Sequence, residues 1–268
     1  MKKILFIGYG NMGAALGEAW RARSEGARVL AIDPAFATRP AAHGFASAQA
    51  LADAGEGGAF DLIVLAVKPA MAADALRALP HPWMQGAVLL SIAAGVRLAS
   101  LRAAAPAGLR LVRAMPNTPA LLGLGCTGLF AEADVDEAAR EQLGALLRHV
   151  GSVHWLQAEA QIDQVTAISG SGPAYYHLFS EALAQAGQAL GLPAELARAL
   201  AAGTAAGAAA QQGAPGADFA ALRRAVTSPN GTTAAAIAVF EQDEALRQLV
   251  LKAAQAAHRR AIELSSAA

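Results

Sequence analysis

The sequence lacks several features that would assign it to common classes of protein. It has one cysteine, Cys126, in 268 residues, so no disulfide can form within the chain; this is typical of a reducing compartment. Its six histidines are scattered without the spacing of metal ligands, and we expect no metal. Lysine plus arginine equals aspartate plus glutamate, at 21 each, so no net charge would attract nucleic acid.

Long uninterrupted hydrophobic runs are also missing. The start of the chain superficially resembles a signal peptide, but its apolar run stops at Gly8 and no cleavage site follows. The uncharged stretches 114–131 and 199–217 are interrupted by proline, glycine and polar residues, which makes them unsuited to cross a bilayer. We therefore predict a cytoplasmic protein with no membrane span. The chain is long enough for one large domain or two smaller ones.

What the sequence does contain is a glycine-rich turn near its start. The apolar run 3–7 is followed by Gly8, Gly10 and Gly13, and then by an Ala/Leu-rich segment. In a dinucleotide site with the spacing G-x-G-x-x-G, the first glycine makes the turn and the second lets the backbone approach the pyrophosphate. The third lets the helix pack closely on the strand. A glycine-rich turn that binds nothing is the alternative, but the flanking strand and helix favour a nucleotide site.

Further strands are predicted to alternate with helices through the first half of the chain. Their ranges are 28–33, 61–67, 87–92, 109–114, 125–130 and 152–156. Continuously apolar strands are typical of a parallel sheet covered on both faces. The pattern predicts an α/β protein with a Rossmann-like, doubly wound, mostly parallel sheet, and we assign residues 1–158 to this dinucleotide-binding domain.

The type of nicotinamide cofactor depends on the end of the second predicted strand. Asp33 lies about 20 residues beyond Gly13, where a carboxylate accepts hydrogen bonds from the ribose of NAD(H) and repels the 2′-phosphate of NADP(H). Arg39 is close in sequence and could offset that repulsion. Both NADP(H) and NAD(H) therefore stay open as cofactors.

From about residue 159 the strand-like runs disappear, and an Ala-rich pattern with helical spacing continues to the end. The predicted helices are 173–190, 193–212, 218–225, 232–240 and 243–265. We assign residues 159–268 to an all-helical domain for substrate binding and dimerisation. A small helical domain with so much apolar surface should bury part of it against another subunit, so we predict at least a homodimer.

Unusual residues follow several predicted parallel strands, at the edge where ligands bind in doubly wound sheets. They are Lys68 and Pro69 after the third strand, 91–95 after the fourth and 115–119 after the fifth. An ordinary interpretation exists for the first pair, since proline is common at the first helical position and lysine is usually a solvated charge. Because the glycine loop lies at the same edge, the pattern predicts one cleft.

Two hydroxyl-rich loops interrupt the alanine background of the helical half. They have the sequences Ser-Gly-Ser-Gly-Pro at 169–173 and Thr-Ser-Pro-Asn-Gly-Thr-Thr at 227–233. We expect each to place hydroxyls and free N–H groups at a helix start, where the dipole favours a carboxylate or phosphate. Capping a helix requires only one hydroxyl. The second loop has four and no charged side chain, which suits a small anionic substrate.

In their order along the chain, these motifs resemble the pyrroline-5-carboxylate reductase family. The resemblance covers essentially the whole chain, and its last two motifs are the most specific. The motifs are 7–13, 66–69, 91–96, 113–119, 169–175 and 226–233. The resemblance implies reduction of 1-pyrroline-5-carboxylate to L-proline with NADP(H) or NAD(H). It also implies a helical domain that interlocks with its partner, often within a larger ring of dimers, and an active site between the two domains.

The resemblance also implies roles for individual residues. Those expected to bind the cofactor are Gly8, Tyr9, Gly10, Asn11, Met12, Gly13, Asp33, Ala66, Val67, Lys68, Pro69 and Ala93. Those expected to bind the substrate are Val226, Ser228, Gly231, Thr232 and Thr166. Thr233, near the ring nitrogen, and Lys68 are expected to be catalytic. The chain departs from the family at Asn230, where glycine is more usual, and at Ala70, where glutamine is frequent; asparagine tolerates a positive φ better than other non-glycine residues.

The implied reaction transfers a hydride to the C=N carbon of a five-membered cyclic imine. No histidine or carboxylate lies in these loops to act as a strong general acid. A protonated imine is already electrophilic, so the main requirement is to align the two rings and anchor the carboxylate. Two alternatives remain. A 3-hydroxyacid-type dehydrogenase would place an acid–base lysine on the long helix, but 173–190 contains none. A nucleotide-binding regulator without turnover would not need the loop at 227–233.

Overall fold

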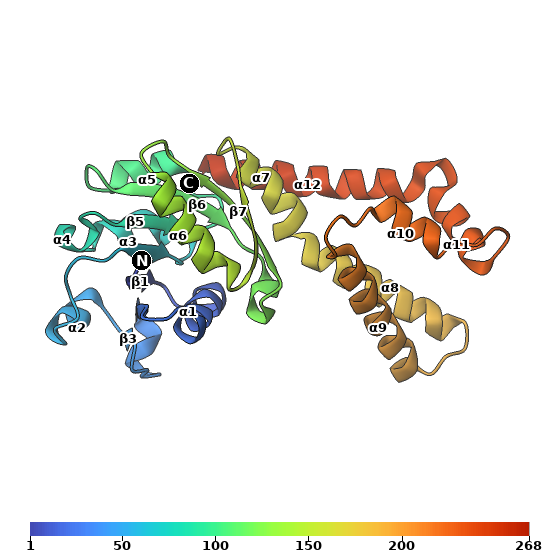
Figure 1. The fold of residues 1–268 in the computed structure, drawn as a ribbon, viewed down its shortest axis with the longest axis horizontal. Helices are drawn as coiled ribbons and strands as arrows, with labels where there is room; N and C mark the ends of the chain where they lie inside the picture. The colour runs from blue at the N-terminus through green and yellow to red at the C-terminus, as the bar shows by residue number, and fades with distance from the viewer. Residues whose placement is uncertain (268) are drawn as a thin grey trace. The chain divides into compact units, whose positions relative to one another are not determined.

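The computed structural model describes residues 1–267, which form two compact units (Figure 1). The N-terminal unit consists of Met1–Ser171 together with the end of the chain from Ala257, and the helical unit consists of Gly172–Ala256. The last helix therefore contributes residues to both. The two compact units divide between Ser171 and Gly172, whereas the predicted domain boundary lies between residues 158 and 159. The boundary between functional domains stays a prediction.

An eight-stranded sheet forms the centre of the N-terminal unit, in the order β3-β2-β1-β4-β5-β6-β7-β8. Every neighbouring pair is parallel except β6 and β7, which are antiparallel. The predicted mostly parallel sheet is confirmed. The strands are β1 (Lys3–Ile7), β2 (Arg28–Ile32), β3 (Gly44–Phe45), β4 (Leu62–Leu65), β5 (Val88–Ser91), β6 (Arg110–Met115), β7 (Gly125–Ala131) and β8 (Gly151–Trp155).

Helices cover both faces of this sheet. Alternate residues of a strand point to opposite faces, and both sets in β1 are buried: Ile4 and Phe6 in one apolar cluster, Leu5 and Ile7 in the other. The continuous apolar runs of the sequence follow from this double burial. The helices are α1 (Asn11–Arg23), η1 (Pro34–Ala37), α2 (Ala48–Asp53), η2 (Pro69–Met71), α3 (Ala72–Arg77), α4 (His81–Met84), α5 (Leu98–Ala104), η3 (Thr118–Leu122), α6 (Glu137–Arg148), α7 (Gln161–Val165) and η4 (Thr166–Gly170).

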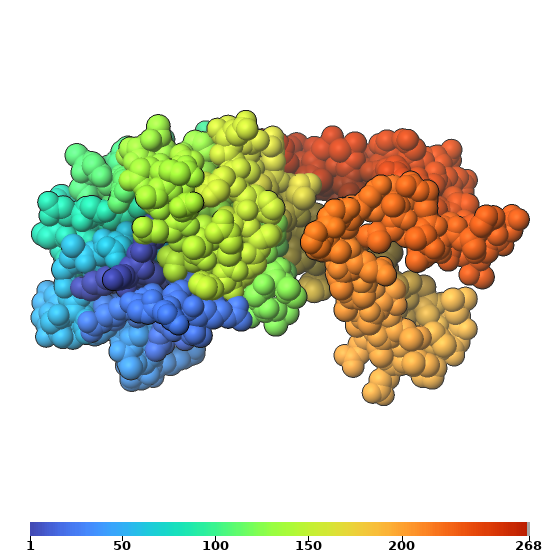
Figure 2. All heavy atoms as spheres, viewed as in Figure 1, coloured from blue at the N-terminus to red at the C-terminus, as the bar shows by residue number. Residues whose placement is uncertain are grey.

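The helical unit has a different construction. Its elements are α8 (Gly172–Ala189), α9 (Ala194–Gln212), α10 (Phe219–Ala225), α11 (Thr232–Glu241), η5 (Gln242–Glu244) and the larger part of α12 (Ala245–Ala267). These helices match the predicted ranges closely. Helices α8 and α9 lie side by side, and in Figure 2 open space separates the turn between them from α11.

Burial within the helical unit is slight. Its only buried residues among those described are Gly172, Ala197 and Ala201. Large apolar side chains are left exposed along its helices, namely Tyr176, Leu178, Phe179, Leu183, Leu196, Leu200, Phe219, Val239, Leu249 and Val250. So much apolar surface in one unit is typical of a subunit interface. In the part of the chain that the structure describes, none of the helices combines the length and hydrophobicity needed to cross a membrane.

Candidate nucleotide and substrate sites

The predicted nucleotide residues lie at one edge of the sheet. Strands β1, β4, β5 and β6 are mutually parallel, so their carboxyl ends point the same way. The segments that follow them are the glycine loop, Lys68-Pro69, 92–96 and 116–118. The topology therefore places these segments, which are far apart in sequence, at the edge where doubly wound sheets bind ligands.

The glycine loop joins β1 to α1 with very little space around two of its glycines. Gly8 has a φ of +86°, and a Cβ built there would lie 2.6 Å from the Ala66 carbonyl oxygen. A Cβ on Gly13 would lie 2.8 Å from the carbonyl oxygen of Gly8. Gly10 is different: it is the N-cap of α1, and a Cβ added to it would have no neighbour within 4 Å. The loop is thus closed towards β4 and open at the start of α1, as an anion site at a helix N-terminus requires.

Asp33 is held at the end of β2 by two backbone donors. The N–H of Tyr9 donates to Oδ2 at 2.7 Å, and the N–H of Ala35 donates to Oδ1 at 2.9 Å. The second bond caps η1. A carboxylate has about four acceptor positions, so this fixed group retains capacity for a ribose hydroxyl. Arg39 follows η1 and is exposed.

The Tyr9 side chain anchors the glycine loop to α1. Its hydroxyl donates to Glu18 Oε1 at 3.0 Å, and its ring centroid lies 5.3 Å from that of His43. A Cβ on Gly17 would clash with the Tyr9 hydroxyl, so the absence of a side chain there makes this arrangement possible. Burial, and then the charge of Glu18, raise the pKa of Tyr9, whereas burial lowers the pKa of His43. Gly17, Glu18 and His43 were not predicted from the sequence, although Gly17 lies four residues after the last glycine of the motif.

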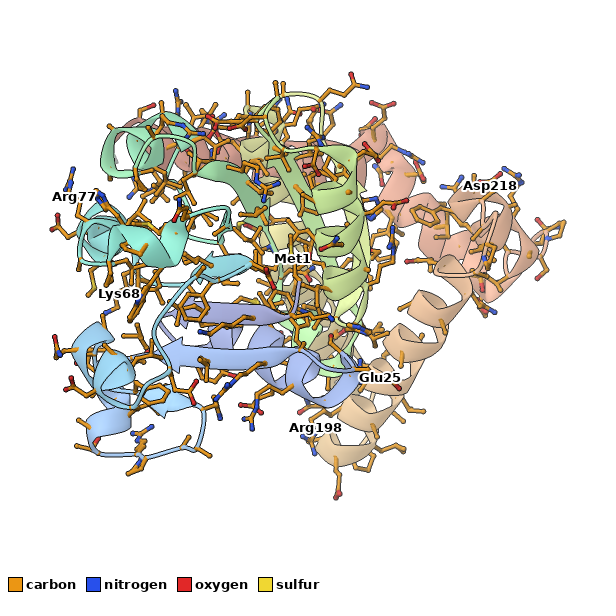
Figure 3. All side chains as sticks on the ribbon, turned by 60° about the vertical axis from the view of Figure 1, so that its left-hand side comes forward. Met1, Glu25, Lys68, Arg77, Arg198 and Asp218 are labelled. Atoms are coloured by element: carbon orange, nitrogen blue, oxygen red, sulfur yellow. The ribbon has the colours of Figure 1, made fainter. Side chains whose placement is uncertain are left out.

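The turn after β4 matches the ordinary interpretation of its proline. Pro69 is the first residue of the short helix η2, and Lys68 is its N-cap. Lys68 is exposed on this turn (Figure 3). Ala93, after β5, is buried, and its N–H lies 3.4 Å from Ser91 Oγ.

A buried charged network lies beside these strand ends. Arg113, on β6, has a side chain only 3% exposed and contacts Glu159 Oε1 at 3.1 Å and Asp163 Oδ1 at 3.3 Å. Ser265, near the end of α12, donates to Asp163 at 2.8 Å, and Glu159 accepts the N–H of Leu98 at 2.8 Å. A buried charge is costly unless it is paired in this way. The signal that could have revealed the network was an arginine inside an otherwise apolar strand.

Asn117 connects two of the sequence motifs. It is 8% exposed; its Nδ2 donates to the Ser169 carbonyl at 3.0 Å, and its Oδ1 accepts the Cys126 N–H at 2.8 Å. The turn at Asn117, which lies between Pro116 and Pro119, therefore has a specific structural partner in the Ser-Gly-Ser-Gly-Pro motif.

The helix start expected in that motif is present, since α8 begins at Gly172, but the residues before it are helical as well. The π-helical turn η4 directly follows α7, and only the turn residue Ser171 separates it from α8. The Ser169 hydroxyl donates back to the Val165 carbonyl at 3.2 Å, and the N–H of Ser171 donates to the Thr166 carbonyl at 2.8 Å. Hydroxyls that bond to the preceding turn let a helix continue through serine and glycine. Thr166 begins this turn, and π-helical turns are frequent at functional sites.

The second hydroxyl-rich loop does lie at a helix start. It connects α10 to α11, with Gly231 as the N-cap of α11. Asn230 has a φ of 59°, so the expectation that asparagine accommodates the loop shape is confirmed. The Gly231 N–H donates to the Ser228 carbonyl at 3.1 Å and is therefore already engaged. The N–H of Thr232, in the first turn of α11, points out of the helix start as first-turn N–H groups do.

Among residues 1–267, no group of three or more histidine, cysteine, aspartate or glutamate side chains could hold a metal ion.

Comparisons with known proteins agree with this arrangement. Residues 159–264 match the family model described as pyrroline-5-carboxylate reductase dimerisation, and residues 3–95 match one described as NADP oxidoreductase coenzyme F420-dependent. The chain is 45% identical to a pyrroline-5-carboxylate reductase of Pseudomonas aeruginosa, over 98% of this chain and 97% of the relative. It is 39% identical to one of Vibrio alginolyticus over 98% and 97% of the two chains.

Two solved structures are similar along nearly their full length. The pyrroline-5-carboxylate reductase of Coxiella burnetii superposes with a TM-score of 0.87 at 36% identity, over 98% of each chain. The pyrroline carboxylate reductase of Plasmodium falciparum, with NADP bound, superposes with a TM-score of 0.81 at 27% identity, also over 98% of each chain. The similarity includes both the sheet and the helical half, and the chain belongs to the pyrroline-5-carboxylate reductase family.

Proposed function

We propose that this chain reduces 1-pyrroline-5-carboxylate to L-proline with NADPH or NADH, the last step of proline biosynthesis. The observation that carries the proposal is the loop 226–233, a hydroxyl-rich turn at the start of α11, in a chain that also has a glycine loop at the start of α1. Relatives at 45% and 39% identity carry the name of this reductase.

For the cofactor, the open N-terminus of α1 would receive the pyrophosphate, and Asp33 the adenine ribose. The remaining contacts are assigned to the glycine loop and to the turns after β4 and β5, namely Tyr9, Asn11, Met12, Ala66, Val67, Lys68, Pro69 and Ala93. The free space at Gly10 fits a phosphate group close to the backbone. When bound, the reduced nicotinamide supplies the hydride.

For the substrate, the carboxylate would be bound by the Thr232 N–H and the Ser228 hydroxyl, with Val226 and Thr166 as further contacts. A helix N-terminus favours such an anion without a charged side chain. The Thr233 hydroxyl would donate a hydrogen bond to the ring nitrogen as the charge of the imine is lost. Lys68 is the second side chain proposed to act in catalysis, by orienting the substrate's negative charge.

The assembly is a homo-oligomer, in agreement with the exposed apolar helices and the dimerisation family model. We propose a homodimer as its basic form and a ring of dimers as a larger one. We also propose that the protein works in the cytoplasm, without nucleic acid or membrane as partners; the single cysteine and balanced charge support this.

A spectrophotometric assay tests the function. Oxidation of NADPH and NADH is followed at equal concentrations, with and without 1-pyrroline-5-carboxylate. We expect oxidation that depends on the substrate with at least one cofactor. Nucleotide binding without such oxidation would favour a regulator, and turnover of a 3-hydroxyacid in its place would favour the related dehydrogenases.

A further inference from the structure

An ion-pair cluster near the loop 226–233 involves three helices of the helical unit and lines the same cavity as Thr227 of the loop. Glu241, the last residue of α11, accepts from Arg223 Nη1 at 2.5 Å. Its two carboxylate oxygens also accept from Arg247, at 2.7 Å from Nη2 and 2.9 Å from Nε. Arg223 belongs to the last turn of α10 and Arg247 to the first turn of α12. One carboxylate therefore joins α10, α11 and α12.

The cluster is connected to the loop by a direct hydrogen bond. The Thr227 hydroxyl, in the loop, donates to the carbonyl of Arg223 at 2.7 Å. Beyond it the loop closes on itself through the turn from Ser228 to Gly231. A loop this short takes its shape largely from the separation and orientation of the two helices that it joins, and the pair between Arg223 and Glu241 links those two helices.

Little else holds this region in place. A cavity of about 260 Å³ lies beside the cluster, lined by Arg223, Arg224, Thr227, Ile237, Glu241 and Arg247. No side chain of α10 or α11 is buried within the described chain. Within the single chain, the contacts that join α10 to α11 are therefore those of the charged cluster and not of apolar packing.

The geometry of the cluster favours the charged forms of Glu241 and Arg247. The two hydrogen bonds from Arg247 hold the pKa of Glu241 below its usual value, and the same carboxylate raises the pKa of Arg247. A bidentate contact between a guanidinium and a carboxylate fixes orientation as well as distance.

We propose that Glu241 is a positioning residue for substrate binding: by holding Arg223 and Arg247 together, it sets the spacing of α10 and α11 and so aims the Ser228 hydroxyl and the Thr232 N–H at the substrate carboxylate. This inference rests on the proposed function of the loop. Glu241 itself does not touch the substrate; it acts through the helices that carry the binding groups.

The test is the variant Glu241→Gln, which keeps the shape of the side chain and removes its charge. The KM for 1-pyrroline-5-carboxylate is measured at saturating NADPH, and the KM for NADPH at saturating substrate. We expect the first to rise roughly tenfold, as for a broken contact within a coupled network. The second should change by less than about twofold, because the glycine loop belongs to the other unit.

The matched control is Glu263→Gln on α12. Glu263 also pairs with an arginine, Arg260, at 2.8 Å, and its side chain is 62% exposed; both KM values should stay unchanged in this variant. A second variant, Arg247→Lys, keeps the charge of the cluster but loses the bidentate contact. Its KM for the substrate should lie between those of the wild type and Glu241→Gln, so the inference can still be judged if Glu241→Gln fails to fold.

Three results would overturn the inference. One is a KM for the substrate in Glu241→Gln that equals the KM in Glu263→Gln. If Glu241→Gln does not fold, the same comparison is made with Arg247→Lys. Another is an equal worsening of both KM values together with loss of the oligomer, which would indicate a role in folding only. The third is a wild-type protein without substrate-dependent oxidation, which would remove the proposed function as well. The wild-type assay therefore distinguishes failure of the function from failure of the positioning role.

Discussion

The two units of this chain obtain their structure in different ways. The N-terminal unit closes two apolar clusters around its sheet, and its described residues with positive φ are all glycines, such as Gly8 and Gly95. The helical unit buries almost nothing, and it contains all three described non-glycine residues with positive φ, Asn230, Asp243 and Glu244. One unit is stabilised by its own packing with little backbone strain, whereas the other has strained turns and must obtain its packing from another subunit.

This difference also separates the two halves of the proposed chemistry. The nucleotide loop is fixed by contacts within a closed domain, such as the bond between Tyr9 and Asp33. The loop proposed to bind the substrate is hydrogen-bonded to a partly exposed ion-pair cluster and closes through a tight turn. Damage to the assembly should therefore affect substrate use before it affects nucleotide binding.

The largest effect should come from a charge placed on an exposed apolar helix. Leu178, on α8, is 65% exposed within the single chain. If this surface is covered by a second subunit, Leu178→Asp would bury a carboxylate and weaken association by more than about 3 kcal/mol, over a hundredfold. Analytical ultracentrifugation over a range of protein concentrations measures this directly.

The control for that comparison is Met71→Asp in the N-terminal unit, where the side chain is 53% exposed. It should leave the association constant unchanged. An oligomer as stable in Leu178→Asp as in the wild type would mean that this part of α8 faces solvent in the assembly.

The next effect concerns the hydroxyl proposed to act on the ring nitrogen. Thr233→Ala should lower kcat by about tenfold to a hundredfold, as expected for one lost hydrogen bond that strengthens in the transition state, and should leave nucleotide binding unchanged. Steady-state kinetics together with nucleotide titration separate the two. Thr204→Ala, at an exposed position on α9, is the matched control; equal turnover in the two variants would remove Thr233 from the mechanism.

A smaller effect is expected in the N-terminal unit, at Asp33. Replacing it by asparagine keeps an acceptor for the Tyr9 N–H but removes the charge that repels a 2′-phosphate. The ratio of kcat/KM for NADPH over NADH should then rise about tenfold, the usual consequence of 1.4 kcal/mol. If the ratio does not move, the exposed Arg39 already determines how the phosphate is received.

The sequence predicted the sheet far better than the contacts that support the sites. Apolar runs and glycine spacing are local signals, so the strands and the glycine loop could be located from the order of residues alone. The supporting residues are brought together over long separations: Arg113 contacts Asp163 and Ser265, and no local pattern links these positions. The π-helical turn that extends α7 through Ser169 was missed because serine and glycine favour a break in isolation, whereas here the Ser169 hydroxyl donates back to the Val165 carbonyl.

The smallest expected effect tests the strain in the helical unit. Glu244 has a φ of 56°, a conformation that costs a residue with a Cβ about 1–2 kcal/mol and glycine little. Since glycine also loses more entropy on folding, Glu244→Gly should stabilise the protein by a net of about 0.5–1 kcal/mol. Thermal unfolding at one fixed protein concentration measures this, because the melting temperature of an oligomer depends on concentration. Gln242→Gly, where φ is −56°, gains no relief of strain and should lower the melting temperature. Equal shifts in the two variants would mean that the turn after α11 stores no strain in the assembled protein.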